Sequence, residues 1–156
     1  MKSGIKLAPF TMPQGNFPRM IVSPIDVLNP NDKMPGITRL KLMAMWDTGA
    51  DYCMISPSLA RNLRLTHYGD ASVNRAEGED LQRKSYLVNL VLPNGVYFDN
   101  VIAIEDNGLN NIGVEFLIGL AVINGIDFAL THDKDGGTVL SISFPAGRLV
   151  DFCSGK

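Results

Sequence analysis

Turn-forming residues divide most of this sequence into short apolar runs, and this pattern limits the folds that the chain can adopt. Pro93-Asn94-Gly95 is typical of a tight hairpin, because Asn and Gly tolerate the positive φ angles that such turns require. Asp133–Gly137 is a second segment rich in Asp and Gly. Short runs bounded by such turns indicate strands rather than long helices. We therefore predict a mostly-β barrel or sandwich with one or two short helices.

The apolar runs also give the expected positions of the elements. Strands are expected at Ile37–Trp46, Tyr52–Ile55, Tyr86–Leu92, Val96–Ile104, Val114–Ile118, Ile126–Thr131 and Thr138–Phe144. A helix is expected to begin at Ser56-Pro57, since serine is a good N-cap and proline suits the first helical position. A second short helix is expected at 119–124, a mobile polar turn at 69–80 and a loop at 106–113.

The chain has the length of a single domain, with 156 residues. Residues 1–35 carry six of the nine prolines, so we expect an extended N-terminal arm, or an edge strand with loops. Residues 36–150 are expected to form the folded domain, and residues 151–156 a C-terminal tail.

Composition argues against several classes of function. The net charge is −2 and no block of Lys and Arg stands out, so no nucleic-acid partner is expected. Apolar stretches such as Phe116–Ile123 are too short to cross a bilayer, and Met1–Phe10 lacks the apolar core of a signal peptide. Cys53 and Cys153 form no CxxC motif and have no nearby pair of histidines. We therefore expect a cytoplasmic protein with no membrane partner, no metal and no cofactor.

The segment with the most chemical content is Asp47-Thr48-Gly49, at the end of an apolar run. It places a carboxylate on a tight turn, where Gly49 allows backbone amides to approach that carboxylate closely. Thr48 supplies a hydroxyl that can hold the turn against a neighbour. An isolated Asp-Thr-Gly is more often a plain β-turn, so the flanking sequence has to decide its role.

Several flanking segments are similar to those of a known family. Cys53-Met54-Ile55 follows the turn, and Phe116-Leu117-Ile118-Gly119 comes about 70 residues downstream. Together with Leu92-Pro93-Asn94-Gly95 and Gly125–Ala129, they resemble the retropepsin-like aspartic peptidases, and most closely the single-domain bacterial members. The resemblance spans residues 37–144. It implies a closed acid-protease barrel with one lobe per chain, in which Asp47 is the catalytic residue.

The chemistry of this family requires a second carboxylate. Acid–base hydrolysis of a peptide bond uses two carboxyl groups that share a proton, one to accept from water and one to donate to the carbonyl oxygen. The sequence contains a single Asp-Thr-Gly and is too short for two lobes. The second carboxylate is therefore expected from Asp47 of another copy, across a twofold axis. The predicted function is that of an aspartic endopeptidase, a homodimer that cleaves a peptide or protein substrate.

The resemblance assigns roles to further residues. Thr48 would donate its hydroxyl across the twofold axis, and Gly49 would position the substrate backbone. The substrate-binding residues that it implies are Ala50, Asp51, Glu77, Gly78, Glu79, Leu117 and Ile118. Glu77, Gly78 and Glu79 would form the tip of a flap, although a tip with one glycine and several acids departs from the family pattern. A second departure is Leu120, which stands where retroviral members have an arginine.

Two other interpretations remain open from the sequence. In one, the same dimeric fold is retained as a peptide-binding or assembly module without useful turnover, which the acidic flap tip and Leu120 would fit. In the other, the chain is a small β-barrel whose Asp-Thr-Gly is coincidental, and this interpretation predicts a monomer in solution.

Overall fold

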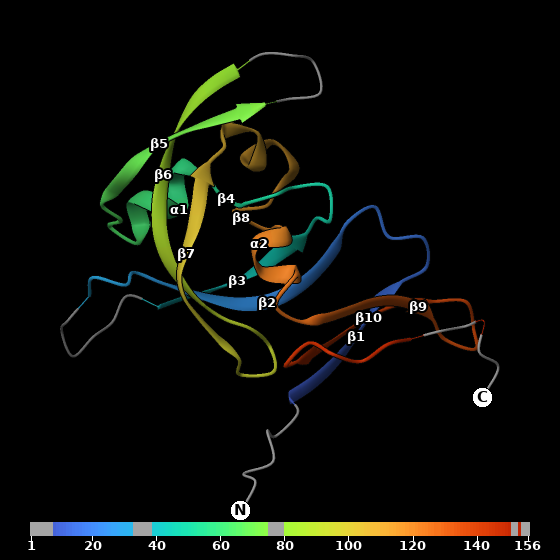
Figure 1. Ribbon diagram of the computed structural model, residues 1–156. Coiled ribbons are helices and arrows are strands. Elements are labelled where there is room, and N and C mark those ends of the chain that lie inside the picture. The colour runs from blue at the N-terminus through green and yellow to red at the C-terminus, as the bar shows by residue number, and fades with distance from the viewer. Residues whose placement is uncertain (1–7, 33–38, 75–79, 151–152, 154–156) are drawn as a thin grey trace, which may run out of the picture.

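The computed structural model describes residues 8–32, 39–74, 80–150 and 153 (Figure 1). In chain order its elements are β1 (Ala8–Gly15), β2 (Ile21–Leu28), β3 (Arg39–Trp46), β4 (Cys53–Ile55), α1 (Pro57–Asn62), β5 (His67–Asn74), β6 (Asp80–Val91), β7 (Tyr97–Glu105), the 3-10 helix η1 (Asn107–Ile112), β8 (Phe116–Ile118), α2 (Leu120–Ile123), β9 (Asp127–His132) and β10 (Thr138–Phe144).

Six of the strands close into a barrel. The larger sheet has the order β2-β3-β8-β4-β7-β6-β5, and β2 also pairs with β6 from Asp26↔Val91 to Leu28↔Asn89. This extra pairing joins the two ends of the run from β2 to β6 into a ring and leaves β5 outside it. The structure therefore confirms the mostly-β closed barrel that the sequence predicts.

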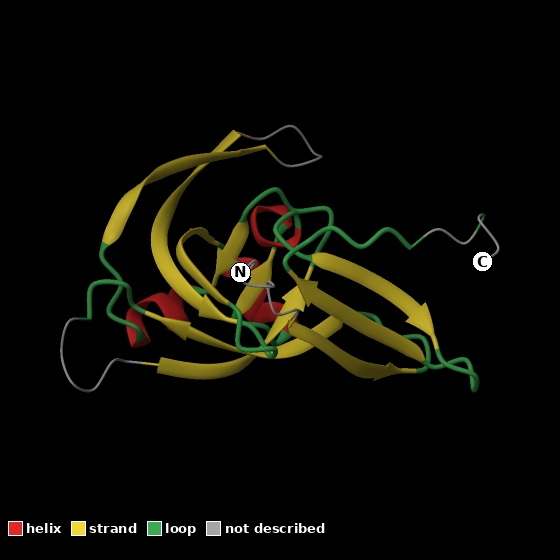
Figure 2. Ribbon diagram, turned by 60° about the horizontal axis from the view of Figure 1, so that its bottom comes forward, coloured by secondary structure: helices red, strands yellow, loops and turns green. Residues whose placement is uncertain are grey.

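The remaining strands form a smaller antiparallel sheet of order β1-β10-β9, which extends from one side of the barrel (Figure 2). Alternate residues on its strands join the barrel core, among them Phe10, Phe128 and Ile142. The ring of Phe128 lies 5.4 Å from the ring of Trp46, measured between centroids. Because strand side chains alternate between faces, one face of this sheet packs on the barrel core.

The expectation of an extended N-terminal arm over residues 1–35 is wrong for residues 21–28. They form β2, which pairs with β3 along its whole length and contributes the buried side chains of Ile25 and Val27 to the core. The prolines do not prevent this arrangement, because they lie where a missing N–H is tolerated. Pro9 and Pro13 are on β1, an edge strand, and Pro24 is in the part of β2 that pairs with β3 but not with β6.

Residues 69–80 also differ from the expected polar turn. Residues 69–74 and 80 belong to the antiparallel hairpin of β5 and β6, with register from Gly69↔Ser85 to Asn74↔Asp80. Most of the described β5 side chains are exposed, so the strand carries no apolar alternation that a sequence pattern could reveal. The predicted flap-tip residues Glu77, Gly78 and Glu79 lie outside the described residues.

The local turn and cap predictions agree with the structure. The Ser56 hydroxyl accepts a hydrogen bond from the Leu59 N–H at 3.1 Å and caps α1, as a serine N-cap should. Gly95, at φ 80°, closes the hairpin between β6 and β7. The expected loop at 106–113 contains the short helix η1, capped by Asp106. Within the described part of the chain, no helix combines the length and apolar character that crossing a bilayer requires.

Candidate active site

The Asp47 turn connects two strands that are consecutive in sequence but not paired with each other. Strand β8 lies between them, parallel to β3 through Met45↔Leu117 and antiparallel to β4 through Met54↔Leu117. The connection over residues 47–52 therefore arches across the C-terminal end of β8.

Three backbone hydrogen bonds hold this arch to the last residue of β8 and to the segment that follows it. The Asp47 N–H donates to the Ile118 carbonyl at 3.0 Å, at the start of the arch. Further along, the carbonyl of Ala50 accepts from the Leu120 N–H at 2.8 Å, and the carbonyl of Asp51 accepts from the Ala121 N–H at 2.9 Å. Both ends of the turn are thus fixed by main-chain contacts from residues distant in sequence.

Gly119 makes this close contact possible. A Cβ atom at this position would lie 2.3 Å from the Tyr52 carbonyl oxygen and 2.7 Å from the Ala50 carbonyl oxygen, both of which are backbone atoms. The Gly119 φ angle is −97°, which any residue can adopt, so the requirement for glycine is one of space. This contact gives a physical reason for an apolar-apolar-Gly segment downstream of Asp-Thr-Gly.

Cys53 lies buried directly below the arch. The Gly119 backbone hydrogen-bonds to this thiol, but burial is the larger influence and raises the pKa of Cys53 to about 11. The thiol therefore stays protonated at physiological pH and acts as a small core residue.

The Asp47 carboxylate lies half-buried at the top of the turn. The Gly49 N–H donates to its Oδ1 atom at 2.8 Å, and this bond fixes the orientation of the carboxylate. Gly49 and Thr48 are themselves exposed. Among the residues that the structure describes, no Lys or Arg side chain forms an ion pair with Asp47. Within this described part of the chain, the carboxylate is thus oriented by a backbone N–H and not by an ion pair.

A cavity of about 300 Å³ lies beside the turn. One part of the lining comes from Gly49, Ala50, Asp51 and Tyr52 of the arch and from Met54 of β4. Ile104 of β7, which pairs with Met54, also lines it, and Ser72 and Val73 of β5 complete the lining. The hairpin of β5 and β6 extends past the ends of β4 and β8 in Figure 1, and its strand β5 contributes to the lining of this cavity. An extended chain entering between β5 and the arch would meet both polar side chains, such as Asp51 and Ser72, and apolar ones, such as Val73 and Met54.

The predicted residues Leu117 and Ile118 lie under the turn. Leu117 is 4% exposed and belongs to a small cluster with Ala50 and Leu109, while Ile118 is fully buried in the main core. In the single chain both residues support the arch from below. Of the other predicted site residues, Ala50 and Asp51 lie at the cavity with Gly49.

One supporting residue was not predicted from the sequence. The Trp46 indole N–H donates to the Ser23 hydroxyl at 2.9 Å, and both side chains are buried. This bond ties the residue before Asp47 to β2. A single sequence contains no signal for it, because residues 21–28 were expected to lie in an arm outside the domain.

Ser23→Ala is expected to lower the free energy of unfolding by roughly 1–3 kcal/mol, because the Trp46 N–H would be left buried without an acceptor. Urea unfolding followed by the fluorescence of Trp46, the single tryptophan, measures this loss. Ser72→Ala is a matched control, since Ser72 is exposed, and we expect a change of at most about 0.5 kcal/mol there. Equal losses in the two variants would show that the buried bond contributes nothing.

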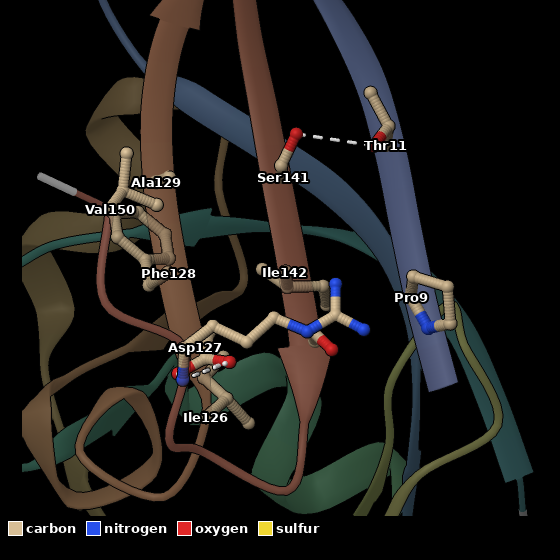
Figure 3. Close-up of a pocket in the computed structure, with 11 residues that line it drawn as sticks. Pro9, Thr11, Ile126, Asp127, Phe128, Ala129, Ser141, Ile142 and Val150 are labelled. Atoms are coloured by element: carbon tan, nitrogen blue, oxygen red, sulfur yellow. Dashed lines mark hydrogen bonds between the residues drawn. The ribbon is translucent and has the colours of Figure 1, made fainter. Parts of the chain in front are cut away.

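A larger cavity, of about 550 Å³, lies between the smaller sheet and the segment after β10 (Figure 3). Thr11 and Ser141 share a hydrogen bond of 3.1 Å in its wall. The carboxylate in this cavity, Asp127, accepts hydrogen bonds from the N–H groups of Gly147 and Arg148. Asp127 therefore holds residues 147–148 against the sheet, and among the residues that the structure describes it is the single carboxylate that lines this cavity.

Comparison with solved structures identifies the fold. A retropepsin-like aspartic protease from Rickettsia conorii superposes with a TM-score of 0.57 and 17% sequence identity, over 89% of this chain and 92% of that one. The EIAV protease in complex with an inhibitor matches with a TM-score of 0.41 and 16% identity, over 64% of this chain and 94% of that one. No family model and no curated protein sequence matches the chain. The chain has a retropepsin-like fold.

Proposed function

We propose that this chain is one half of an aspartic endopeptidase that hydrolyses peptide bonds only as a homodimer. The observation that carries the proposal is the half-buried Asp47 carboxylate, which accepts the Gly49 N–H on a backbone-clamped turn whose next residues, Gly49 to Tyr52, line a cavity. Asp106 accepts the same kind of bond from the Gly108 N–H at a plain turn, so the distinguishing feature of the Asp47 turn is its backbone clamp to Ile118, Leu120 and Ala121. The retropepsin-like fold supports the same proposal.

The proposed reaction uses one Asp47 from each subunit. One carboxylate is ionised and accepts a proton from water, which attacks the peptide carbonyl carbon. The other is protonated and donates to the carbonyl oxygen, so that a tetrahedral diol forms. Collapse of the diol breaks the C–N bond as a carboxyl group returns a proton to the leaving nitrogen. Two carboxyl groups in contact share one proton, because both cannot ionise at short range.

The proposed substrate is an extended peptide or protein segment bound between the arch and the hairpin of β5 and β6. Gly49 and Asp51 would meet the substrate backbone, and Ala50 would form part of the wall beside it. Thr48, which is exposed, would hold the arch of the partner through its hydroxyl. The proposal places Glu77, Gly78 and Glu79 over the substrate and Leu117 and Ile118 beneath the arch.

A second candidate function is a dimeric peptide-binding or assembly module of the same fold. Leu120 favours it, because an apolar residue follows Gly119 where a retroviral member would carry an arginine that joins the subunits and the turn. This module would bind unfolded protein at the same cavity without cleaving it. Turnover therefore separates the two candidates.

Cleavage of an unfolded protein is expected to be fastest at mildly acidic pH and to fall as the pH rises above neutrality. The pair of carboxyl groups must hold one proton, and raising the pH removes it, so the loss of activity lies on the alkaline side. The measurement is the initial rate of cleavage across the pH range, with and without pepstatin. A profile that peaks near pH 9, or cleavage that pepstatin does not reduce, would contradict the aspartic mechanism, and binding without cleavage at any pH would favour the module.

A further inference from the structure

We infer that the turn between β1 and β2, residues 16–20, is the surface through which each subunit contacts a second copy beside the Asp47 pair. The inference rests on the proposed function, because it assumes that Asp47 of one copy meets Asp47 of another. It adds the residues that make the contact, with Phe17 as the central one.

The turn lies at the same end of the barrel as Asp47. Strands β2 and β3 are antiparallel, and Ile21 at the start of β2 pairs with Trp46 at the end of β3. Met20 and Asp47 are therefore each one residue beyond the same pair. A second copy that brings its own Asp47 to this end also approaches the turn over 16–20.

Phe17 has a conformation and an exposure that the single chain does not explain. It is 95% exposed, and its φ angle is 50°, in the left-handed region that bulky side chains rarely adopt. Met20, in the same turn, is 38% exposed. An aromatic ring left in water at a strained backbone position is unfavourable in the isolated subunit.

The other two non-glycine residues at positive φ have local explanations for their conformation. Arg64 ends the α1 turn, where its N–H donates to the Arg61 carbonyl and its own carbonyl accepts from the Asn29 amide. Asn100 is an asparagine, a residue type that tolerates this region, and its N–H donates to Asn89. In the described part of the chain, no comparable bond holds Phe17, so its conformation points to a contact outside the single chain.

Hydrogen bonds at the base of the turn shape it within the single chain, so Phe17 is exposed before any partner arrives. The side-chain amide of Gln14 donates to the Val22 carbonyl at 2.9 Å and accepts from the Val22 N–H at 2.8 Å. This pair of bonds closes the base of the turn, and Gly15, at φ 82°, lets the chain leave β1 there. A preformed apolar turn loses little conformational freedom on association.

The partner that fits this surface is a second copy of the chain. A twofold axis through the Asp47 pair makes the contact self-complementary, so that the turns of both copies lie beside the same axis. The turn supplies two exposed apolar side chains, Phe17 and Met20, and carries one charge, Arg19, as expected for the centre of a subunit contact. The dimer thus removes the Phe17 ring from water at the point where it completes the site.

Phe17→Asn tests the inference, because asparagine tolerates a positive φ angle while removing the ring. Sedimentation across a range of concentrations gives the dimer dissociation constant, which we expect to rise about tenfold or more. Phe17→Gly should act in the same direction, since glycine also accepts this φ angle. The melting temperature of the monomer, measured below the wild-type dissociation constant, should not fall, because Phe17 is exposed there.

Tyr68→Asn is the matched control, since this aromatic residue is 61% exposed on β5, outside the closed ring of the barrel. Its dissociation constant should stay within about twofold of wild type. If wild type dimerises and cleaves protein while both Phe17 variants keep its dissociation constant, the inference is wrong and the proposed function stands. If wild type stays monomeric at every concentration and cleaves nothing, the proposed function fails, and the inference with it.

Discussion

Asp47→Asn is expected to abolish peptide-bond cleavage while the protein still folds and dimerises. The substitution removes both carboxyl groups of the shared site, because each subunit contributes the same residue. Since a positioned acid or base contributes typically about 10²–10⁴-fold, we expect a loss of at least roughly 10⁴-fold in kcat. An amide at this position can still accept the Gly49 N–H, so the turn keeps its structure. Initial rates on an unfolded protein, with circular dichroism and sedimentation as checks, measure the effect.

Mixing experiments make this test specific for a shared site. When wild-type and Asp47→Asn chains are refolded together in equal amounts, about one quarter of the dimers carry two wild-type subunits. Activity should therefore fall to about that fraction of the value for wild type refolded alone at the same total chain concentration, and not to one half. Asp99→Asn is the matched control, because Asp99 is an exposed carboxylate on β7. An equal mixture of wild-type and Asp99→Asn chains should keep the activity of wild type refolded alone. Cleavage that survives Asp47→Asn would exclude the aspartic mechanism.

Gly119→Ala is expected to be the most destabilising small substitution at the site. The added methyl carbon would lie 2.3 Å from the Tyr52 carbonyl oxygen, so the backbone of the arch or of α2 would have to move. That movement would lengthen the bonds from Leu120 to Ala50 and from Ala121 to Asp51. We expect a loss of roughly 3–5 kcal/mol in the free energy of unfolding, which a urea titration followed by Trp46 fluorescence would measure.

Gly69→Ala provides the control for Gly119→Ala. A Cβ atom at Gly69 would meet only the Ser85 hydroxyl, at 3.9 Å, which is an ordinary contact. We expect a change within about 1 kcal/mol of wild type. If the two alanine variants unfold at the same urea concentration, the close approach of Gly119 to the arch does not stabilise the turn.

The features that the sequence predicted correctly are those decided by near neighbours. The α1 start at Ser56-Pro57 depends on a hydroxyl reaching an N–H three residues away. The turn at Asn94-Gly95 depends on Gly95, which accepts the positive φ angle found there, whereas Asn94 does not adopt one. Short apolar runs between such turns indicate a mostly-β fold, because each run forms one strand and the chain reverses its direction at the next turn.

The wrong expectations concern segments whose partners are distant in sequence. Residues 21–28 contain one proline and come after three more, so their composition resembled that of an extended arm. Their pairing with β3 and β6 nevertheless makes them a barrel strand. Residues 69–74 are polar because β5 lies outside the closed ring with most side chains in solvent, and polar composition does not distinguish such a strand from a loop.

The sequence by itself determined the mostly-β character, the local turns and caps, and the identity of Asp47 as the candidate catalytic carboxylate. Only the tertiary structure decided that β8 enters between β3 and β4, that Gly119 touches the Asp47 arch, and that Ser23 holds Trp46. These contacts join residues separated by long stretches of chain, and they exist only once the barrel closes and sets the strand register. Local preferences bias the conformation of each segment, whereas the geometry of a site is set by which segments meet.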